Sequence, residues 1–337
     1  MDPGSGEEVT LAGASGANAA AGGDRAPAIR LDGVVHRYGK TEALKGISLA
    51  VPRGIICGLV GSNGAGKTTT LKILATLLRP TAGRVELLGG ELPRTMSEAR
   101  RRIGYMPDFF GVYQDLEVTE YLEFFAAAYG LRGARRRQVV GDVLELTGLA
   151  GKRGHVIGSL SRGMQQRLGL ARVLVHDPAL LLLDEPASGL DPRARVEVAA
   201  ILGELRGMGK TILISSHILH ELEEMCDMLA IIESGRLLFT GTLAELRASV
   251  GGGLRQVRLE IDEPGELERR LRELPQVAEV EPVSGGGWRV VLGADGAWDV
   301  PDLAAWLVGS GYRVRRLEPN EPNLQEVFML VTKGEVA

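Results

Sequence analysis

The sequence predicts an α/β protein that has a mainly parallel sheet at its core, an antiparallel β part and a small C-terminal α+β domain. Three observations support this fold class. An apolar run leads through the glycine-rich segment Gly61–Thr68 into a helical pattern, a second apolar run at Leu180–Leu183 ends in two carboxylates, and strands alternate with helices. Apolar strands that alternate with helices are typical of a parallel sheet buried on both faces.

Length and composition indicate how many domains the protein has and argue against nucleic-acid-binding and disulfide-rich proteins. The chain has 337 residues and is 45% hydrophobic, which suits one large domain with a smaller one. The net charge of −4 does not indicate a nucleic-acid-binding protein. We interpret the basic clusters Arg100–Arg102 and Arg135–Arg137 as solvent-exposed helix faces. The two cysteines, Cys57 and Cys226, exclude a disulfide framework and favour a reducing compartment.

The sequence shows no sign of a membrane-spanning segment or of a secretory signal. No apolar stretch approaches the roughly 18–20 residues needed to cross a bilayer. Residues Met1–Glu8 lack the basic start and the apolar centre of a secretory signal. We therefore expect a cytoplasmic protein whose membrane association comes through a partner.

The N-terminal part is expected to begin with a tail and then to form strands. Residues 1–27 are rich in Gly, Ala and Ser and have few large apolar side chains, so we expect them to be disordered. From Ile29 onward the pattern favours strands, and Pro80 is expected to end the first helix. The predicted elements are strands at Val34–Tyr38, Leu44–Val51, Ile55–Val60 and Arg84–Leu88, and a helix at Thr69–Leu78.

The middle of the chain is expected to carry a helical insert. Residues from about 97 to 176 favour helices, with amphipathic patterns at Thr119–Tyr129 and Arg137–Leu149. A glycine run after Val250 marks a domain boundary, so residues 28–250 are predicted to form the main domain. After the insert we expect strands at Leu180–Leu183 and Thr211–Ser215 and a helix at Arg193–Leu205.

Residues 251–337 are predicted to form an accessory α+β domain. The order β-α-β-β-α-β is typical of a ferredoxin-like split βαβ unit. The expected elements are strands at Gln256–Ile261, Val277–Val283, Trp288–Leu292 and Arg313–Leu317, helices at Gly265–Leu274 and Val300–Val308, and a terminal helix at Leu324–Val331.

The glycine-rich loop has the spacing G-x-x-x-x-G-K-[ST], the pattern of a phosphate-binding loop between a strand and a helix. Glycines let the backbone turn several N–H groups toward phosphates at a helix N-terminus, where the helix dipole favours anions. Lys67 adds a cation for the terminal phosphates, and the Thr68 hydroxyl suits Mg²⁺. The loop is predicted to bind a nucleoside triphosphate through Gly61, Ser62, Asn63, Gly64, Ala65, Gly66, Lys67 and Thr68.

Two adjacent carboxylates, Asp184 and Glu185, follow the apolar strand Leu180–Leu183. In such sheets, ligands bind at the C-terminal ends of the strands. Adjacent side chains project in different directions, so Asp184 can orient Mg²⁺ or its water while Glu185 acts as general base on the attacking water. The alternative is a strand that merely ends in a polar turn.

A third motif, Leu160–Arg167, begins a helix that runs to about Val175. The ordered series of phosphate loop, Ser-x-Gly helix start, Asp-Glu strand end and downstream histidine resembles the ATP-binding cassette (ABC) ATPases, which are P-loop NTPases. The resemblance covers roughly residues 29–250. It implies the cassette fold, ATP and Mg²⁺ as cofactors, and catalytic roles for Glu185, His217 and Lys67.

The resemblance also implies further contacts with the nucleotide. Tyr38 would stack on adenine, although a simple strand-face aromatic is the alternative. Thr69 would lie close to the α-phosphate. His217 would contact the γ-phosphate, whereas a lone histidine at a strand end normally has no such role.

Other matching positions imply an interface between two cassettes. Ser161 and Gly163 match the family signature, which approaches the γ-phosphate held by the opposite subunit; ordinary helix capping is the alternative for Ser161. Asp191 matches the end of a family loop that would communicate across that interface. The signature departs from the family's usual Leu-Ser-Gly-Gly-Gln at Arg162 and Met164, but the two positions suited to phosphate contact are retained.

A second departure concerns the metal. Asp108 stands where the family commonly has a glutamine. A carboxylate can ligate Mg²⁺ but repels phosphate, so we expect Asp108 to sense the metal through water.

The resemblance implies the energy-coupling subunit of a transporter. The chain holds one cassette, so a complete machine needs a homodimer or a heterodimer with a second ABC ATPase. The segment Glu321–Phe328 resembles the tail of exporter ATPases whose polytopic membrane permease is a separate chain, which would place this protein on the inner face of the cell membrane. The alternative is a soluble ABC ATPase that acts on ribosomes or nucleic acid, which tandem cassettes or a basic face would favour.

Overall fold

The computed structural model describes residues 26–92, 96–109, 111–251, 255–263, 265–283, 286–293, 298–319 and 332. The chain divides into two compact units, and the second comprises residues 219–224 and 241–335. The sequence placed this boundary later, after Val250; helix α8 (Leu243–Gly251) instead groups with the second unit. The predicted tail, apart from residues 26 and 27, and the predicted helix at Leu324–Val331 lie outside the described residues.

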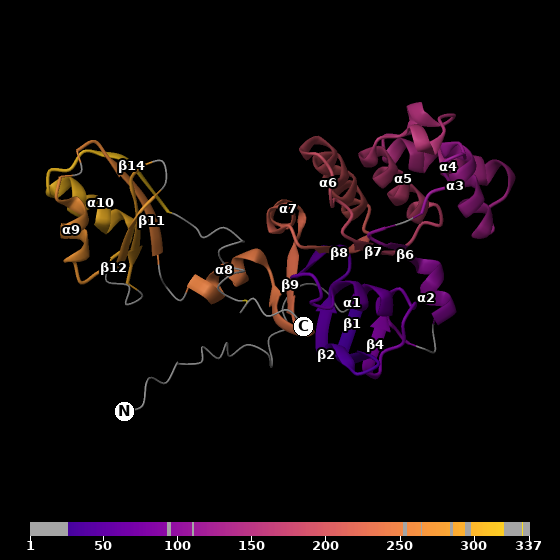
Figure 1. Ribbon diagram of the computed structural model, residues 1–337, viewed down its shortest axis with the longest axis horizontal. Coiled ribbons are helices and arrows are strands. Elements are labelled where there is room, and N and C mark those ends of the chain that lie inside the picture. Colours follow the sequence, from indigo (N-terminus) through magenta and orange to yellow (C-terminus); the bar gives the residue numbers. More distant parts are fainter. Residues whose placement is uncertain are drawn as a thin grey trace. The chain divides into compact units, whose positions relative to one another are not determined.

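A six-stranded sheet forms the centre of the first unit (Figure 1). Its neighbouring strands from β9 to β6 pair in parallel, which confirms the mainly parallel sheet. Every residue of the three strands at its centre is buried, as expected for a sheet covered on both faces. In spatial order the strands are β10 (Arg236–Gly241), β9 (Met228–Glu233), β3 (Ile56–Val60), β8 (Thr211–Ser216), β7 (Leu180–Asp184) and β6 (Ile103–Met106).

Strand β6 corrects the expectation of a helical segment from about 97 to 176. Its four residues pair with β7, so the parallel sheet continues into this segment. Gly104 is needed there, because a Cβ atom would lie 2.9 Å from the carbonyl oxygen of Val173 in the helix that covers the strand. A four-residue strand with a glycine has a weak local pattern, and its pairing with β7 decides its structure.

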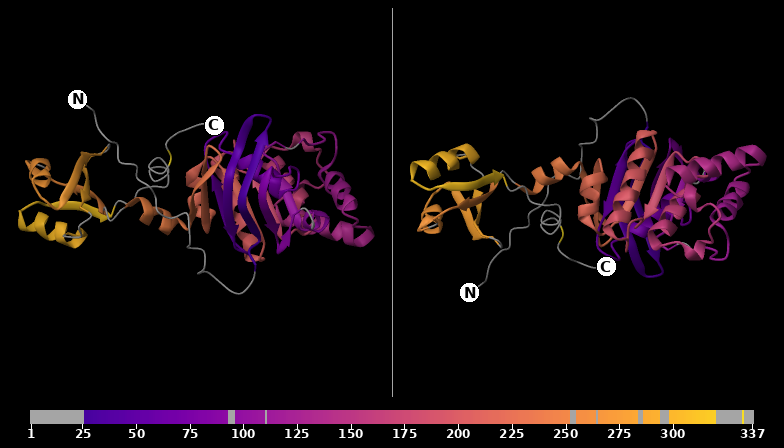
Figure 2. Two further views of the ribbon diagram at one scale, coloured as in Figure 1. Left: turned by 90° about the horizontal axis from the view of Figure 1, so that it is seen from below. Right: turned by 90° about the horizontal axis from the view of Figure 1, so that it is seen from above.

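A smaller antiparallel sheet contains β2 (Thr41–Val51), β1 (Ile29–Tyr38), β4 (Ala82–Leu87) and β5 (Gly90–Glu91), in that order. Its apolar side chains share one core with α1 (Lys67–Leu74) and with one face of the parallel sheet. Figure 2 shows the indigo strands of this sheet as a layer over the parallel sheet. The strands predicted at Val34–Tyr38 and Leu44–Val51 are confirmed.

Helix α1 is shorter than predicted. The sequence placed its end near Leu78, before Pro80, but it ends at Leu74. Thr76 adopts a φ of 60°, a left-handed conformation that no α-helix continues through. The turn is held by Arg100, whose Nε donates to Thr76 Oγ1 at 2.7 Å. A contact between distant residues therefore decides this boundary.

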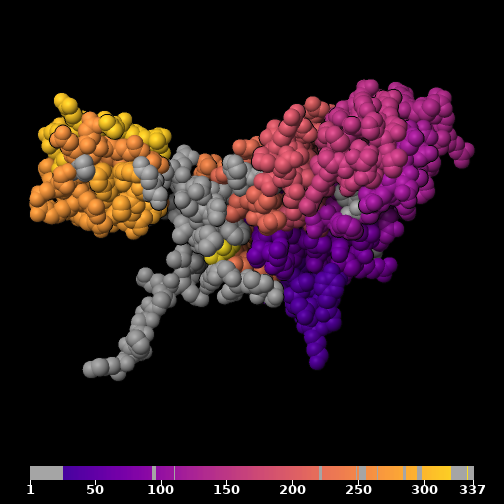
Figure 3. All heavy atoms as spheres, turned by 45° about the horizontal axis from the view of Figure 1, so that its top comes forward, coloured from indigo at the N-terminus to yellow at the C-terminus, as the bar shows by residue number. Residues whose placement is uncertain are grey.

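The remaining helices of the first unit include the predicted amphipathic pair. Helices α3, α4 and α5 contact one another, and their magenta and pink atoms gather in one lobe in Figure 3. Helix α5 also contacts β6, and α6 contacts β8. The helices are α2 (Met96–Arg102), α3 (Val118–Ala128), α4 (Gly133–Leu146), α5 (Arg162–Leu174) and α6 (Pro192–Gly207), with 3₁₀ turns η1 (Ala150–Lys152) and η2 (Ile157–Ser159).

The second unit has the predicted ferredoxin-like order. Its sheet runs β12-β13-β11-β14 and is antiparallel at every pair, so each strand–helix–strand unit is split by a strand of the other. The helices share one apolar core with the sheet. The elements are β11 (Arg255–Ile261), α9 (Leu267–Arg272), β12 (Val277–Pro282), β13 (Trp288–Leu292), α10 (Val300–Gly309) and β14 (Val314–Pro319), preceded by α8 and by α7 (Leu219–Met225).

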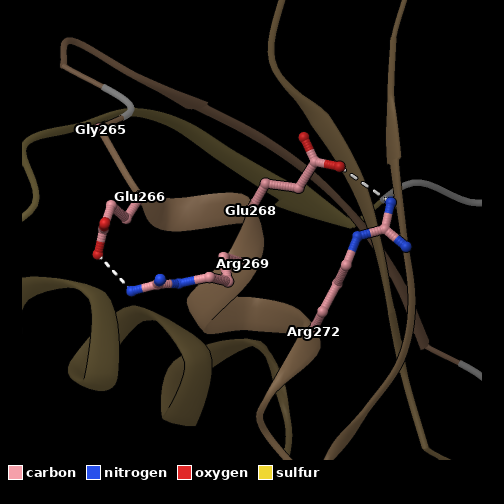
Figure 4. A pocket seen from close by; sticks show the side chains of 5 residues that line it. All are labelled: Gly265, Glu266, Glu268, Arg269 and Arg272. Atoms are coloured by element: carbon pink, nitrogen blue, oxygen red, sulfur yellow. Dashed lines mark hydrogen bonds and ion pairs between the residues drawn. The ribbon is translucent and has the colours of Figure 1, made fainter.

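A shallow hollow lies on α9 in the second unit (Figure 4). Its charged side chains pair with each other: Arg269 lies 2.6 Å from Glu266, and Arg272 lies 2.9 Å from Glu268. None of the residues predicted to bind nucleotide lines this hollow. Across the described residues, we find no helix with the length and apolar character needed to span a bilayer.

Candidate functional site

Part of the predicted site, namely the glycine-rich loop, the two carboxylates and His217, meets at one edge of the parallel sheet. Val60 of β3 is in register with Ser216 of β8, and Asp184 of β7 is in register with Ser215. The chain leaves these strands into the glycine-rich loop, into Glu185 and into His217. The register therefore brings together segments that are far apart in the sequence, at the edge where ligands bind in such sheets.

The glycine-rich loop wraps tightly at the start of α1. Gly64 and Gly66 have positive φ values of 83° and 110°. Residues that carry a Cβ atom strongly disfavour such backbone conformations, whereas glycine adopts them readily. A Cβ atom at Gly61 would lie 2.3 Å from the Ile232 carbonyl oxygen, and one at Gly66 would lie 2.6 Å from Leu44 Cδ2. Only glycine fits at both positions, and the loop presents its backbone at the N-terminus of a helix, which favours anions.

Lys67 lies inside this loop and is 5% exposed. Its Nζ donates to the carbonyl oxygens of Gly61 at 2.7 Å and Ser62 at 3.2 Å. The same Nζ lies 3.6 Å from Glu185 Oε1. The lysine cation is thus held where the phosphates of a nucleotide would enter the loop.

Glu185 joins the loop to His217. Its carboxylate lies between the Lys67 ammonium and the His217 ring, whose Nδ1 is 2.8 Å from Glu185 Oε2. The backbone at Glu185 has a φ of 50°, a left-handed conformation that costs a non-glycine residue about 1–3 kcal/mol. Such strain is common at functional sites, where the surrounding contacts fix the geometry.

Ser215 contacts the Asp184 carboxylate and the Glu185 backbone, and it was not predicted as a site residue. Its hydroxyl donates to Asp184 Oδ1 at 2.6 Å and accepts from the backbone N–H of Glu185 at 3.0 Å. Asp184 itself is 1% exposed. The only sequence feature that could have indicated this role of Ser215 is its position as a polar residue at the end of the apolar strand before His217.

Asp108 is exposed just after the end of β6. It and Asp184 lie within electrostatic reach of the Tyr105 hydroxyl, which is buried and has no hydrogen-bond partner among the described residues. Burial, followed by these two carboxylates, raises the pKa of Tyr105 to about 12. Because Met106 of β6 is in register with Leu183 of β7, Asp108 and Asp184 lie near the ends of neighbouring strands at the same edge of the sheet.

The signature residues have different partners. Ser161 caps α5 by accepting from the backbone N–H of Met164 at 3.3 Å, and a Cβ at Gly163 would lie 2.9 Å from Ala194 Cβ. Asp191 caps α6 in the same way, accepting from Ala194 N–H at 2.9 Å. In the described part of the chain, no hydrogen bond or ion pair joins Ser161 to residues 61–68.

The remaining predicted nucleotide contacts are placed as follows. Thr68 is exposed and Thr69 is half-buried at the start of α1. Tyr38 ends β1, is 49% exposed, and meets the ring of His36 edge-on with centroids 4.6 Å apart. Among the described residues no ring contact joins Tyr38 to the loop, and its stacking on adenine stays a prediction.

Comparisons with known proteins agree with this geometry. Residues 44–188 match the ABC transporter family, and residues 241–332 match the C-terminal domain of ATP-binding proteins like DrrA1-3. The daunorubicin resistance ATP-binding protein DrrA3 of Streptomyces coeruleorubidus is 33% identical over 321 residues, covering 90% of this chain and 96% of that protein.

Two further matches are shorter. The Nod factor export ATP-binding protein I of Burkholderia orbicola (strain AU 1054) is 44% identical over 208 residues, covering 62% of this chain and 68% of that protein. A solved ATP-binding subunit of an ABC transporter superposes with a TM-score of 0.60 at 31% identity, covering 66% of this chain and 93% of that one. Because the match to the first relative spans nearly its whole length, this chain belongs to the ATP-binding proteins of ABC transporters, which are ATPases.

Proposed function

We propose that the chain is the ATP-hydrolysing, energy-coupling subunit of an ABC exporter whose polytopic membrane permease is a separate polypeptide. One observation carries the proposal: Lys67, Glu185 and His217 meet at the phosphate loop, which is the arrangement needed to hydrolyse a bound nucleotide. The names of two relatives, for Nod factor export and for daunorubicin resistance, support the export direction. On this proposal the protein is peripheral on the inner face of the cell membrane.

In the proposed reaction, each charged group has its own task. Glu185 accepts the proton of the attacking water as general base, and His217 fixes the orientation of that carboxylate through the 2.8 Å contact and reaches the γ-phosphate. Lys67 exchanges its carbonyl partners for phosphate oxygens and neutralises charge as the terminal phosphate leaves. Tyr38 stacks on adenine, and Thr69 lies near the α-phosphate.

The residues beside the loop fit Mg²⁺. The described residues contain no cluster of three or more His, Cys, Asp or Glu side chains that could hold a metal alone. Mg²⁺ needs no such cluster, because it keeps several waters and binds one or two protein oxygens together with phosphate. Asp184, oriented by Ser215, and the exposed Thr68 hydroxyl supply hard oxygen donors, and the bound ion would supply charge neutralisation.

Asp108 is proposed to act on this metal through water. Replacing Asp108 with alanine should raise the Mg²⁺ concentration for half-maximal ATP turnover by about threefold or more, because a water-mediated charged contact is lost. The measurement is a Mg²⁺ titration at fixed ATP. Asp142→Ala in α4 removes another exposed carboxylate and is the control. An unchanged Mg²⁺ requirement and turnover in Asp108→Ala would show that this role is wrong.

A complete catalytic centre is proposed to need two cassettes. Ser161 and Gly163 lie at the N-terminus of α5, where backbone donors and the helix dipole favour a phosphate from a second subunit. Asp191 holds the start of α6 beside them. ATP binding would then close a homodimer or a heterodimer with a second ABC ATPase, and hydrolysis would open it.

Identifying the protein to which this chain binds tests the proposed function. A tagged form of the chain, extracted in mild detergent from its native cells, should retain a polytopic membrane protein. Adding that protein in vesicles should change the ATP turnover of the chain. Ribosomal proteins or nucleic acid as the only partners, with no effect of any membrane protein on turnover, would favour the soluble alternative and contradict the proposal.

A further inference from the structure

Arg162, one of the two departures in the signature, contacts the loop that follows Glu185. It is the first residue of α5, and its Nη2 donates to the Ser188 carbonyl oxygen at 3.2 Å. The guanidinium also covers Gly189, since a Cβ atom there would lie 2.5 Å from Arg162 Cζ. Gly189 has a φ of 66°, so this position favours glycine for two reasons.

The contact lies one tight turn away from the proposed general base. Ser188 N–H donates to the Glu185 carbonyl oxygen at 3.1 Å and closes the turn that begins at Glu185. Glu185 is itself in a strained conformation, with a φ of 50°. A strained residue keeps its geometry only when its surroundings fix it, and Arg162 supplies one of those contacts from a different element.

We propose that Arg162 is a positioning residue that links the signature end of α5 to the turn 185–189 and thereby holds Glu185 in its active geometry. The inference rests on the proposed function, because it assigns to α5 a role in the chain's own catalytic turn.

Substitutions at Arg162 separate this role from nucleotide binding. Arg162→Ala should lower kcat about tenfold and leave the KM for ATP within about twofold, because a small displacement of a general base slows the chemical step without changing the loop. Arg162→Lys should regain most of kcat, since an ammonium can donate to the same carbonyl. Arg137→Ala removes an exposed arginine from α4 and should match the unmodified protein.

A double-mutant cycle tests the contact itself. Gly189→Ala should reduce kcat, and its effect should be at least about threefold smaller in the Arg162→Ala background, because the clash with the guanidinium is then absent. Additive effects would overturn the proposal. A kcat for Arg162→Ala equal to that of the unmodified protein, or a raised KM with unchanged kcat, would overturn it as well. Unfolding midpoints confirm that each variant is folded.

Failure of this inference can be told apart from failure of the proposed function. The Glu185→Gln variant is examined for ATP-dependent dimers by light scattering. If it dimerises while Arg162→Ala turns over normally, only the role of Arg162 is wrong. If it stays monomeric with Mg-ATP and permease present, the two-cassette mechanism fails, whereas the contact between Arg162 and Ser188 lies within one chain and is judged by the kinetics of its own variants.

Discussion

Replacing Glu185 with glutamine is expected to lower kcat for ATP hydrolysis by about 10²–10⁴-fold, the usual contribution of a general base. The amide keeps the size of the side chain and can still bond to His217, but it accepts no proton from water and loses its ion pair with Lys67. ATP binding should persist, because the phosphate loop is unchanged. Phosphate release and nucleotide titration measure the two effects separately.

This variant also tests how the cassettes assemble. Since ATP binds but is not consumed, the nucleotide-bound dimer should accumulate and be seen by light scattering with saturating Mg-ATP. Glu204→Gln, an exposed glutamate in α6, makes the same chemical change away from the site and should hydrolyse normally. Wild-type turnover by Glu185→Gln would refute the assignment of the base.

Loss of the Lys67 ammonium should abolish ATP binding at working concentrations. Lys67→Ala removes the cation whose Nζ is held by Gly61 and Ser62, and a lost charge-assisted contact to phosphate in a buried site costs about 2–5 kcal/mol, or roughly 30-fold to several thousand-fold in affinity. The change also leaves Glu185 without its cationic neighbour. Calorimetric titration with ATP gives the affinity directly.

Two further variants sharpen this test. Lys72→Ala alters the same residue type on the same helix, away from the loop, and should bind ATP normally. Lys67→Arg should not restore binding, because the planar guanidinium is larger than the ammonium that fits 2.7 Å from the Gly61 carbonyl oxygen. Near-normal affinity in Lys67→Ala would show that backbone N–H groups alone hold the phosphates.

Local patterns predicted much of the fold. The strand before Gly61 and the apolar run before Asp184 are continuous apolar segments, and both are buried strands, as such runs in an α/β pattern predict. The ferredoxin-like order followed from the succession of elements. Strand β6 was missed, because four residues carry too little pattern to outweigh their helical neighbours.

Most of the candidate site could also be predicted, and what was missed depends on register. Lys67, Glu185 and His217 were predicted and do lie together. Ser215 was missed, because its role depends on β7 and β8 pairing so that one hydroxyl reaches two carboxylate-bearing residues. The contact between Arg162 and Ser188 joins helix α5 to the loop after Glu185, and no local sequence pattern predicts a contact between separate elements.

The strand order of the parallel sheet constrains how the protein can be made. Strand β3 pairs with β8 on one side and β9 on the other, and both are synthesised long after it. A growing chain therefore carries an apolar strand without sheet neighbours until Ser216 has left the ribosome, which exposes it to aggregation meanwhile. A polypeptide that ends before β8 also lacks Ser215 and His217, the two residues that hold Glu185, so we expect ATP hydrolysis to require the completed sheet.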